Sequence, residues 1–412
     1  METSEYRFLF ASVDAPPKTG GVANLSVNLA RELTRSKQTK EGVFVGPSGT
    51  HFADYDINFK VIEDFNSDTR LRAEDFCELE DSRIEDLFSR LIEGYNLNQL
   101  MLFHPFYFGM GGIHAAHRNK IAANLYLHGT ELTSQIPELI DTTEEVDLNR
   151  SDPNNSLRTR LIETVRNADR LFTNSHFSKE LIAKLAPETP ITVTGCGIDR
   201  NFFKAETSSG VESLVFEKTM KREKLGLPPG PMFVSVGRLV PHKNTDLSIR
   251  LMAEMSDAQL FIIGSGPEEE NLRKLAFELG VSDRVNFLGS IDEGRKWKYL
   301  RAADVGILAS GFSEETGGYE GFGIVMLEYT AAGCLTLTPG RHGMYDFAKR
   351  FEAGIIGLES EETLSETASM LQALLADQEE VQTRVEHARK VVEHRYTWQE
   401  VSNVMIEALN EG

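Results

Sequence analysis

Cysteine is scarce in this sequence, and long apolar runs are missing from it. The three cysteines among 412 residues, Cys77, Cys196 and Cys334, lie far apart and form no CxxC pair. This favours neither a disulfide framework nor a zinc cluster. Apolar stretches such as Phe8–Val13 fall far short of the roughly 18 residues that a membrane span needs, and no signal peptide is evident. We therefore expect a protein of the reducing cytoplasm with no integral membrane segment.

Positive charge is also in short supply. The chain has 43 Lys and Arg against 63 Asp and Glu, a formal net charge of −20. Binding nucleic acid by phosphate neutralisation requires dense Lys and Arg on one face, so we exclude nucleic acid as a partner. The sequence has no evident basic, aromatic patch, so we do not expect firm membrane attachment. Transient contact with a lipid-linked acceptor remains an alternative. An anionic ligand would need a local pocket of positive charge.

The sequence does contain a repeated alternation of short β-type runs and longer helical stretches. This alternation is typical of βα units and a parallel sheet, and the length suggests two domains. The expected strands are Arg7–Val13, Gly42–Gly46, Ile57–Ile62, Leu100–His104, Ala122–Leu127, Leu171–Asn174 and Ile191–Val193, and then Met232–Val236, Leu260–Ile263, Arg284–Leu288, Val305–Leu308 and Leu335–Thr338.

The segment Lys204–Pro231 separates the two series of strands. It is polar, has a pattern that predicts a short helix at Phe216–Leu225, and ends in the cluster Pro228–Pro231, which stops regular structure. We predict an N-terminal domain at 1–205, a C-terminal domain at 206–395, and an amphipathic helix within 396–412.

Glycines follow several of the expected strands. Gly20 and Gly21 precede a helix expected to begin near Asn24, where backbone N–H groups could meet a phosphate; a purely structural turn is the alternative. Gly264 and Gly266 follow a later strand and would let a ligand approach the backbone. A dinucleotide fingerprint would need glycine at position 269, which is glutamate, so a dehydrogenase is disfavoured.

Two cations follow the strand Met232–Val236. Arg238, directly after Gly237, and Lys243 lie five positions apart in a predicted loop. They could clamp both phosphates of a diphosphate, Arg as a planar fork and Lys as a point charge. The alternative is a pair of solvated surface cations.

The segment Glu320–Glu328 carries a carboxylate at each end. Glu320 precedes the turn Gly321, Phe322, Gly323, and Glu328 follows an apolar run expected to begin a buried helix. Residues seven or eight apart return to a similar helical face, and carboxylates accept hydrogen bonds from vicinal hydroxyls of a sugar or ribose. The alternative is a helix cap at Glu320 and a salt bridge at Glu328.

These motifs together resemble glycosyltransferase family 4, a retaining family of GT-B fold. Glu320–Glu328 is similar to its E-x7-E motif, and Gly237, Arg238 and Lys243 are similar to its donor-phosphate motif. Gly20–Gly21 resembles its glycine loop, and His128–Gly129 its active-site histidine turn. The resemblance implies two Rossmann-like, doubly wound domains facing across a cleft, with the C-terminal helix packing back on the first.

The resemblance also implies residue roles. Arg238 and Lys243 would hold the diphosphate, Glu328 the ribose hydroxyls, and Glu320 the transferred sugar. His128 would lie against the reacting face, and the strand end at Leu288 would take the base through main-chain groups. The complete expected set is Gly20, Gly21, His128, Gly237, Arg238, Lys243, Gly264, Gly266, Leu288, Glu320, Gly321, Phe322, Gly323 and Glu328.

We therefore expect a retaining glycosyltransferase that moves a hexose-type sugar from a nucleoside-diphosphate sugar to an acceptor hydroxyl, in glycan, glycolipid or glycoconjugate biosynthesis. It would need no metal and no other cofactor, because cations already hold the diphosphate. A GT-B phosphorylase, a sugar-nucleotide epimerase and a non-catalytic, partner-binding GT-B subunit remain alternatives.

Some features depart from the family or carry little weight. The stretch 311–319 is longer and more acidic than the usual link before the first glutamate, and Asn244 replaces a common glycine. His114 and His117 have metal-ligand spacing but lack a third ligand, so we discount them. Asp54 and Asp56 form a DxD triplet that we attribute to chance.

Overall fold

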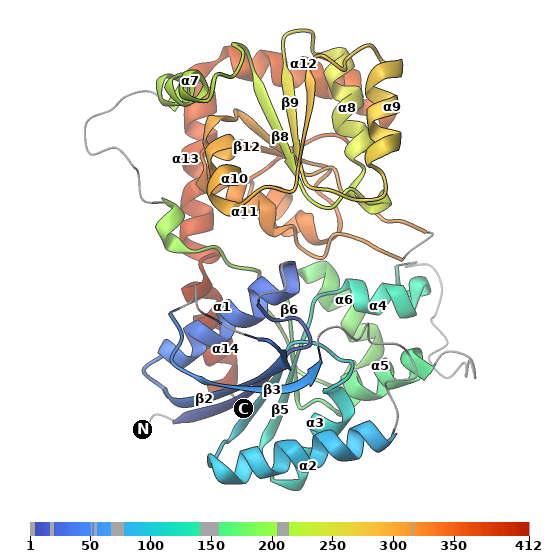
Figure 1. The fold of residues 1–412 in the computed structure, drawn as a ribbon, viewed down its shortest axis with the longest axis vertical. Coiled ribbons are helices and arrows are strands. Elements are labelled where there is room, and N and C mark those ends of the chain that lie inside the picture. The colour runs from blue at the N-terminus through green and yellow to red at the C-terminus, as the bar shows by residue number, and fades with distance from the viewer. Residues whose placement is uncertain are drawn as a thin grey trace. The chain divides into compact units, whose positions relative to one another are not determined.

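The computed structural model describes residues 5–16, 20–50, 52, 56–66, 78–140, 156–203, 214–314 and 317–411. The chain forms two compact units. The first comprises Met1–Gly197 with Trp398–Gly412, and the second Ile198–Thr397. Figure 1 shows helices on both sides of the sheet in each unit.

The first unit is built on a seven-stranded parallel sheet in the order β3-β2-β1-β4-β5-β6-β7. All seven strands expected from the sequence are present, with ends that shift by a few residues. The strands are β1 (Tyr6–Ala11), β2 (Thr39–Ser48), β3 (Lys60–Asn66), β4 (Gln99–Leu102), β5 (Ala122–Leu127), β6 (Arg170–Thr173) and β7 (Ile191–Val193), and the α-helices are α1 (Gly21–Arg35), α2 (Glu78–Gly94), α3 (Gly109–Arg118), α4 (Thr130–Gln135), α5 (Ser156–Asn167), α6 (His176–Leu185) and α14 (Trp398–Asn410).

Strand β1 is buried on both faces, as expected of a central strand in a parallel sheet. Phe8, Leu9 and Phe10 are fully buried, and the Phe10 ring stacks on Phe103 with 6.2 Å between centroids. The apolar run that predicted the strand is thus the run that makes the core.

The C-terminal helix α14 belongs to the first unit. The Tyr6 hydroxyl donates a hydrogen bond to Asn410 Oδ1 at 2.8 Å. At the start of the helix, a Cβ on Gly197 would stand 2.5 Å from the Trp398 ring. Glycine at 197 therefore allows the chain to pass tightly over that indole.

The second unit is built on a six-stranded parallel sheet in the order β10-β9-β8-β11-β12-β13. Counted along its own chain, this order is 3-2-1-4-5-6, the doubly wound Rossmann order. The strands are β8 (Met232–Val236), β9 (Gln259–Ile263), β10 (Val285–Gly289), β11 (Val305–Ile307), β12 (Leu335–Thr338) and β13 (Ile355–Ile356), and the α-helices are α7 (Leu214–Leu225), α8 (Thr245–Glu254), α9 (Glu269–Glu278), α10 (Glu293–Ala302), α11 (Ile324–Ala331), α12 (Leu364–Ala376) and α13 (Gln378–Arg395).

The order of this sheet determines where a ligand can bind. In doubly wound sheets the ligand crevice lies beyond the carboxyl ends of the strands, where the strand order reverses. Here the order reverses between β8 and β11, which are hydrogen-bonded neighbours. Functional groups are therefore expected in the segments that follow these two strands.

Among the described helices, none has the length and apolar character needed to cross a membrane.

Candidate active site

The loop that follows β8 carries both predicted cations. It leaves the sheet at Gly237, whose N–H donates to the Ile263 carbonyl at 3.0 Å, and Leu239 N–H donates to Ser265 at 2.9 Å. Lys243 ends a short 3₁₀ turn, and Asn244 then adopts a left-handed conformation with φ 45° before α8. Asparagine tolerates this region better than most residues, which explains how it can occupy this position.

Gly264 and Gly266 pack against that loop. A Cβ on Gly264 would stand 1.8 Å from the Gly237 carbonyl oxygen, and a Cβ on Gly266 would stand 2.2 Å from the Leu239 oxygen. Gly264 also has φ +138°, which side chains rarely adopt. Both glycines are therefore required by backbone packing within the chain, a reason that the sequence analysis did not anticipate. Contact between their backbone and a ligand stays a prediction.

The two predicted cations differ in their surroundings. Arg238 is exposed and forms no ion pair within the part of the chain that the structure describes. The Lys243 ammonium, whose side chain is 19% exposed, pairs closely with Glu320 Oε2. Arg238 is thus available to an anion, whereas Lys243 would have to exchange or share its partner.

Glu320 is held as a carboxylate by its neighbours. Burial raises the pKa of its carboxyl, but the Lys243 ammonium and a hydrogen bond from Ser310 outweigh that effect, so the pKa lies below its ordinary value. The Ser310 hydroxyl, fully buried just beyond β11, donates to Glu320 Oε2 at 3.1 Å. One oxygen of Glu320 therefore receives both contacts.

Glu328 has a cation of its own. It lies on α11, and its Oε1 accepts a hydrogen bond from the Lys296 ammonium on α10 at 3.0 Å. Burial raises the pKa of the Glu328 carboxyl above its ordinary value, and Lys296 opposes the rise. The two glutamates of the motif are thus separately paired, one with Lys243 and one with Lys296.

The turn between the two glutamates is fixed by close packing. Gly323 caps α11 with φ 89°, and a Cβ there would meet the Leu308 side chain at 2.5 Å. The loop after β12 also returns to this turn: Gly343 N–H donates to the Glu320 carbonyl at 3.1 Å. A Cβ on Gly343 would stand 1.9 Å from the Gly321 oxygen. The helix predicted after the glycine turn is confirmed.

A small hollow of about 10 Å³ lies where the strand order of the second sheet reverses, beside β8 and β11. It is bounded by the carboxyl ends of β8 and β11 and by the loop that follows β8. Its lining residues include Gly237, Arg238, Leu239, Lys243 and Leu308. The side chains of the predicted phosphate motif therefore share one surface, at the position where the sheet topology places a ligand crevice.

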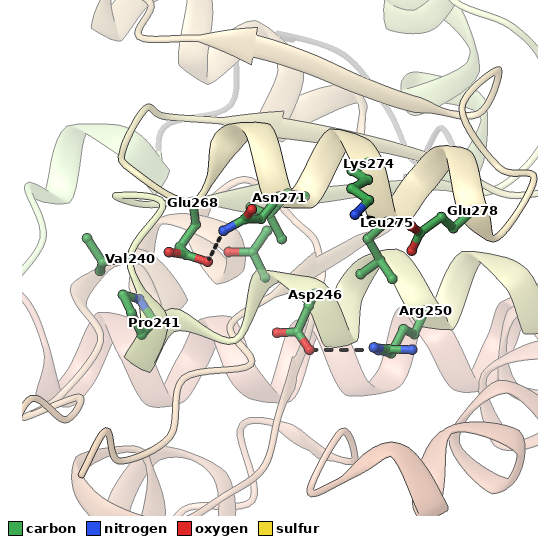
Figure 2. A pocket seen from close by; sticks show the side chains of 11 residues that line it. Val240, Pro241, Asp246, Arg250, Glu268, Asn271, Lys274, Leu275 and Glu278 are labelled. Atoms are coloured by element: carbon green, nitrogen blue, oxygen red, sulfur yellow. Dashed lines mark hydrogen bonds and ion pairs between the residues drawn. The ribbon is translucent and has the colours of Figure 1, made fainter. Parts of the chain in front are cut away.

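A larger hollow of about 410 Å³ lies between α8 and α9. Figure 2 shows side chains of both helices facing it. Its two cations are already matched to carboxylates, Arg250 to Asp246 at 3.8 Å and Lys274 to Glu278 at 3.7 Å. Glu268 adds further negative charge. This hollow offers no free cation to a diphosphate, so size alone does not make it the donor site.

The remaining predicted residues lie in the first unit. Helix α1 begins at Gly21, three residues before the expected start, because Gly20 with φ 150° ends the turn. Neither glycine would bring a Cβ within 4 Å of another heavy atom, so the space beside both is open. Their predicted contact with a phosphate stays a prediction.

His128 follows β5 and is held in one orientation. Its Nε2 lies 2.8 Å from the Phe103 carbonyl oxygen. Since a carbonyl only accepts, Nε2 carries the proton and a neutral ring would leave Nδ1 as an acceptor. The His128 backbone N–H donates to the buried Glu131 carboxylate, and Asn174 donates to the His128 carbonyl at 3.0 Å. This is a preorganised polar turn at a strand end.

The weaker sequence signals are accounted for by other contacts. His117 faces Asp169 at 3.2 Å and His114 faces Glu85 at 3.9 Å, so the two histidines serve different surface carboxylates. Across the described ranges, no group of three His, Cys, Asp or Glu side chains could hold a metal ion. Asp54 lies outside the described residues.

Two residues of the site were missed by the sequence analysis, Ser310 and Lys296. Ser310 lies just beyond β11, at the carboxyl end of a strand beside the point where the order reverses, and that position was a usable signal. Lys296 lies 32 positions before Glu328 on a different helix. No short motif joins it to its partner, so only the fold could reveal the pair.

Comparison with known proteins identifies the second unit. Residues 217–391 match the family described as glycosyl transferases group 1. The matched stretch lies entirely within the second unit. This match confirms, at the level of group 1, the resemblance noted in the sequence, and it covers Arg238, Lys243, Glu320 and Glu328.

One curated relative is similar to this chain over about half of its length. The chain is 26% identical over 231 residues to a GDP-mannose-dependent alpha-(1-6)-phosphatidylinositol monomannoside mannosyltransferase of Mycobacterium tuberculosis. That match covers 55% of this chain and 57% of the relative. The chain thus spans little more than half the length of this curated relative.

Solved structures extend the likeness to almost the whole chain. The HepE protein of Anabaena, solved with UDP and glucose, gives a TM-score of 0.71 at 16% identity, covering 99% of this chain and all of that one. A sucrose-phosphate synthase of Thermosynechococcus elongatus gives 0.74 at 17% identity, covering 99% of each chain. At these identities the likeness establishes the fold: the protein has two Rossmann-like units of the GT-B class.

Proposed function

We propose that the chain is a glycosyltransferase that moves a sugar from a nucleoside-diphosphate sugar to an acceptor hydroxyl with retention of configuration, without a metal ion. The observation that carries the proposal is the pairing of Lys243 with Glu320 beside the exposed Arg238, at the switch point of the second sheet. The relatives support it, because one is named for GDP-mannose and another was solved with UDP.

In this proposal the chemistry follows from the charges. Arg238 and Lys243 grip the diphosphate and stabilise the charge that builds up on it as the glycosidic bond breaks. The Glu320 carboxylate accepts hydrogen bonds from hydroxyls of the sugar. Glu328 accepts from the ribose through the oxygen that Lys296 does not occupy. The leaving phosphate assists deprotonation of the acceptor, as the family resemblance implies.

A thermal-shift screen of UDP, GDP and ADP tests the proposal. A ligand that binds only the folded protein stabilises it, by about 2.7 kcal/mol at 100 times its Kd. We expect one of the three nucleotides to raise the melting temperature of the wild-type protein. Because Arg238 is exposed and carries no internal ion pair, Arg238→Ala should leave the ligand-free melting temperature nearly unchanged and remove most of that shift.

The matched control is Arg384→Ala, since Arg384 is also exposed in the second unit but lies on α13, where it pairs with Glu380 at 2.7 Å. It should keep the full nucleotide shift. A wild-type protein that none of the three nucleotides stabilises would count against the donor assignment.

A further inference from the structure

Lys296 is a buried lysine for which the sequence motifs have no role. It lies on α10, its side chain is 11% exposed, and its ammonium contacts Glu328 Oε1 at 3.0 Å and Glu293 Oε2 at 2.9 Å. Burying an ammonium is costly unless it is paired. The buried Lys296 ammonium therefore depends on these two carboxylates for its stability.

The two carboxylates beside Lys296 are unequal. The Glu293 side chain is 76% exposed, so its bond to Lys296 is screened by water. The Glu328 side chain is 17% exposed, so its pairing with Lys296 takes place largely out of water. Lys296 therefore acts mainly on Glu328, and it occupies one oxygen, leaving Oε2 as the oxygen open to a ligand.

Helix α10 is held firmly enough to serve this purpose. Trp297, the next residue, is buried and stacks on Phe202 with 4.1 Å between ring centroids and 13° between planes. At the start of the helix, Asp292 accepts a hydrogen bond from Arg295 N–H at 2.9 Å. The Lys296 backbone is thus fixed on both sides, which helps to keep its ammonium beside Glu328.

We propose that Lys296 is a positioning residue for donor binding: its ammonium holds one carboxylate oxygen of Glu328 in place so that the other oxygen accepts the ribose hydroxyls. This inference rests on the proposed function. It assigns to α10 a role in nucleotide recognition that the motifs of the sequence do not contain.

The charged groups acting on the Glu328 carboxyl are Lys296 and Glu293. Burial and Glu293 raise the pKa of Glu328, and Lys296 lowers it. Removing the ammonium should raise the pKa further. Since a protonated carboxyl is the weaker acceptor, affinity in the variant should be lost as the pH falls, and at a higher pH than in the wild type.

The test is titration of the full chain with the nucleoside diphosphate that stabilises the wild type, at about pH 6 and about pH 8. Lys296→Met should weaken binding about tenfold at the higher pH, and by a further several-fold at the lower. Lys296→Arg should restore much of the affinity, because the guanidinium keeps the charge. Lys298→Met, on the same helix but exposed, is the matched control and should bind like the wild type.

If Lys296→Met does not fold, Lys296→Gln retains a hydrogen-bond donor without the charge and should show the same pH trend. Affinities and pH profiles of the Met or Gln variant equal to those of the wild type would overturn the role of Lys296 while leaving the proposed function intact. A wild type that binds none of the nucleotides at either pH would instead overturn the proposed function.

Discussion

Replacing Glu320 with glutamine is expected to separate binding from transfer. In the free protein the Lys243 ammonium is engaged by the Glu320 carboxylate. A neutral amide would release that ammonium to the diphosphate, so Glu320→Gln should bind a nucleoside diphosphate at least as tightly as the wild type. The variant loses charge-assisted hydrogen bonds to the sugar, worth about 3 kcal/mol together, which corresponds to roughly 100-fold in transfer rate.

The measurement is a pair of assays on the same preparation: calorimetric titration with the nucleotide, and sugar transfer or donor hydrolysis with the cognate donor. Glu254→Gln, an exposed carboxylate on α8 of the same unit, is the matched control and should change neither value. Transfer at the wild-type rate in Glu320→Gln would contradict the role given to this carboxylate.

Among the substitutions proposed here, Gly264→Ala should lower the free energy of unfolding the most. The new Cβ would overlap the Gly237 carbonyl oxygen at 1.8 Å, and the residue would be strained at φ +138°. Neither backbone can move cheaply, because Gly264 N–H bonds to Gly289 and Gly237 N–H bonds to Ile263. We expect the free energy of unfolding to fall by about 3 kcal/mol. The displaced loop carries Arg238, so nucleotide affinity should fall as well.

Gly280→Ala provides the comparison. Gly280 also has positive φ, +67°, but a Cβ there meets no heavy atom within 4 Å. Only the backbone strain of a left-handed residue remains, about 1 kcal/mol. Denaturant unfolding of the two variants measures the difference. Equal losses for both would show that the contact between the β8 and β9 turns is not a close one.

The strand and helix order could be predicted because the central strands of these sheets are largely buried and therefore largely apolar. The runs Phe8–Val13 and Met232–Val236 are apolar except for one serine each, and the helices between the strands have polar faces. Strand β13, Ile355–Ile356, was missed because two residues carry no detectable periodicity. Helix α1 starts earlier than expected because Gly21 adopts helical geometry directly after Gly20.

The candidate site was only partly predictable, for a related reason. Arg238 and Lys243, or Glu320 and Glu328, lie close in sequence and form motifs. The pairs found in the structure join different elements: Lys243 with Glu320 and Lys296 with Glu328. Such pairs depend on how the strands are ordered in the sheet, which spacing along the chain does not encode. The glycines at 264 and 266 were expected to serve a ligand, yet they also allow two turns to pack.

The most direct test of the account is a crystal structure of the protein with the nucleoside diphosphate that gives the largest thermal shift. We predict that its two phosphates lie beyond the carboxyl end of β8, within hydrogen-bond distance of the Arg238 guanidinium and the Lys243 ammonium. The ribose should lie against Glu328. A diphosphate bound elsewhere, for example in the hollow between α8 and α9, with Arg238 uninvolved, would contradict it.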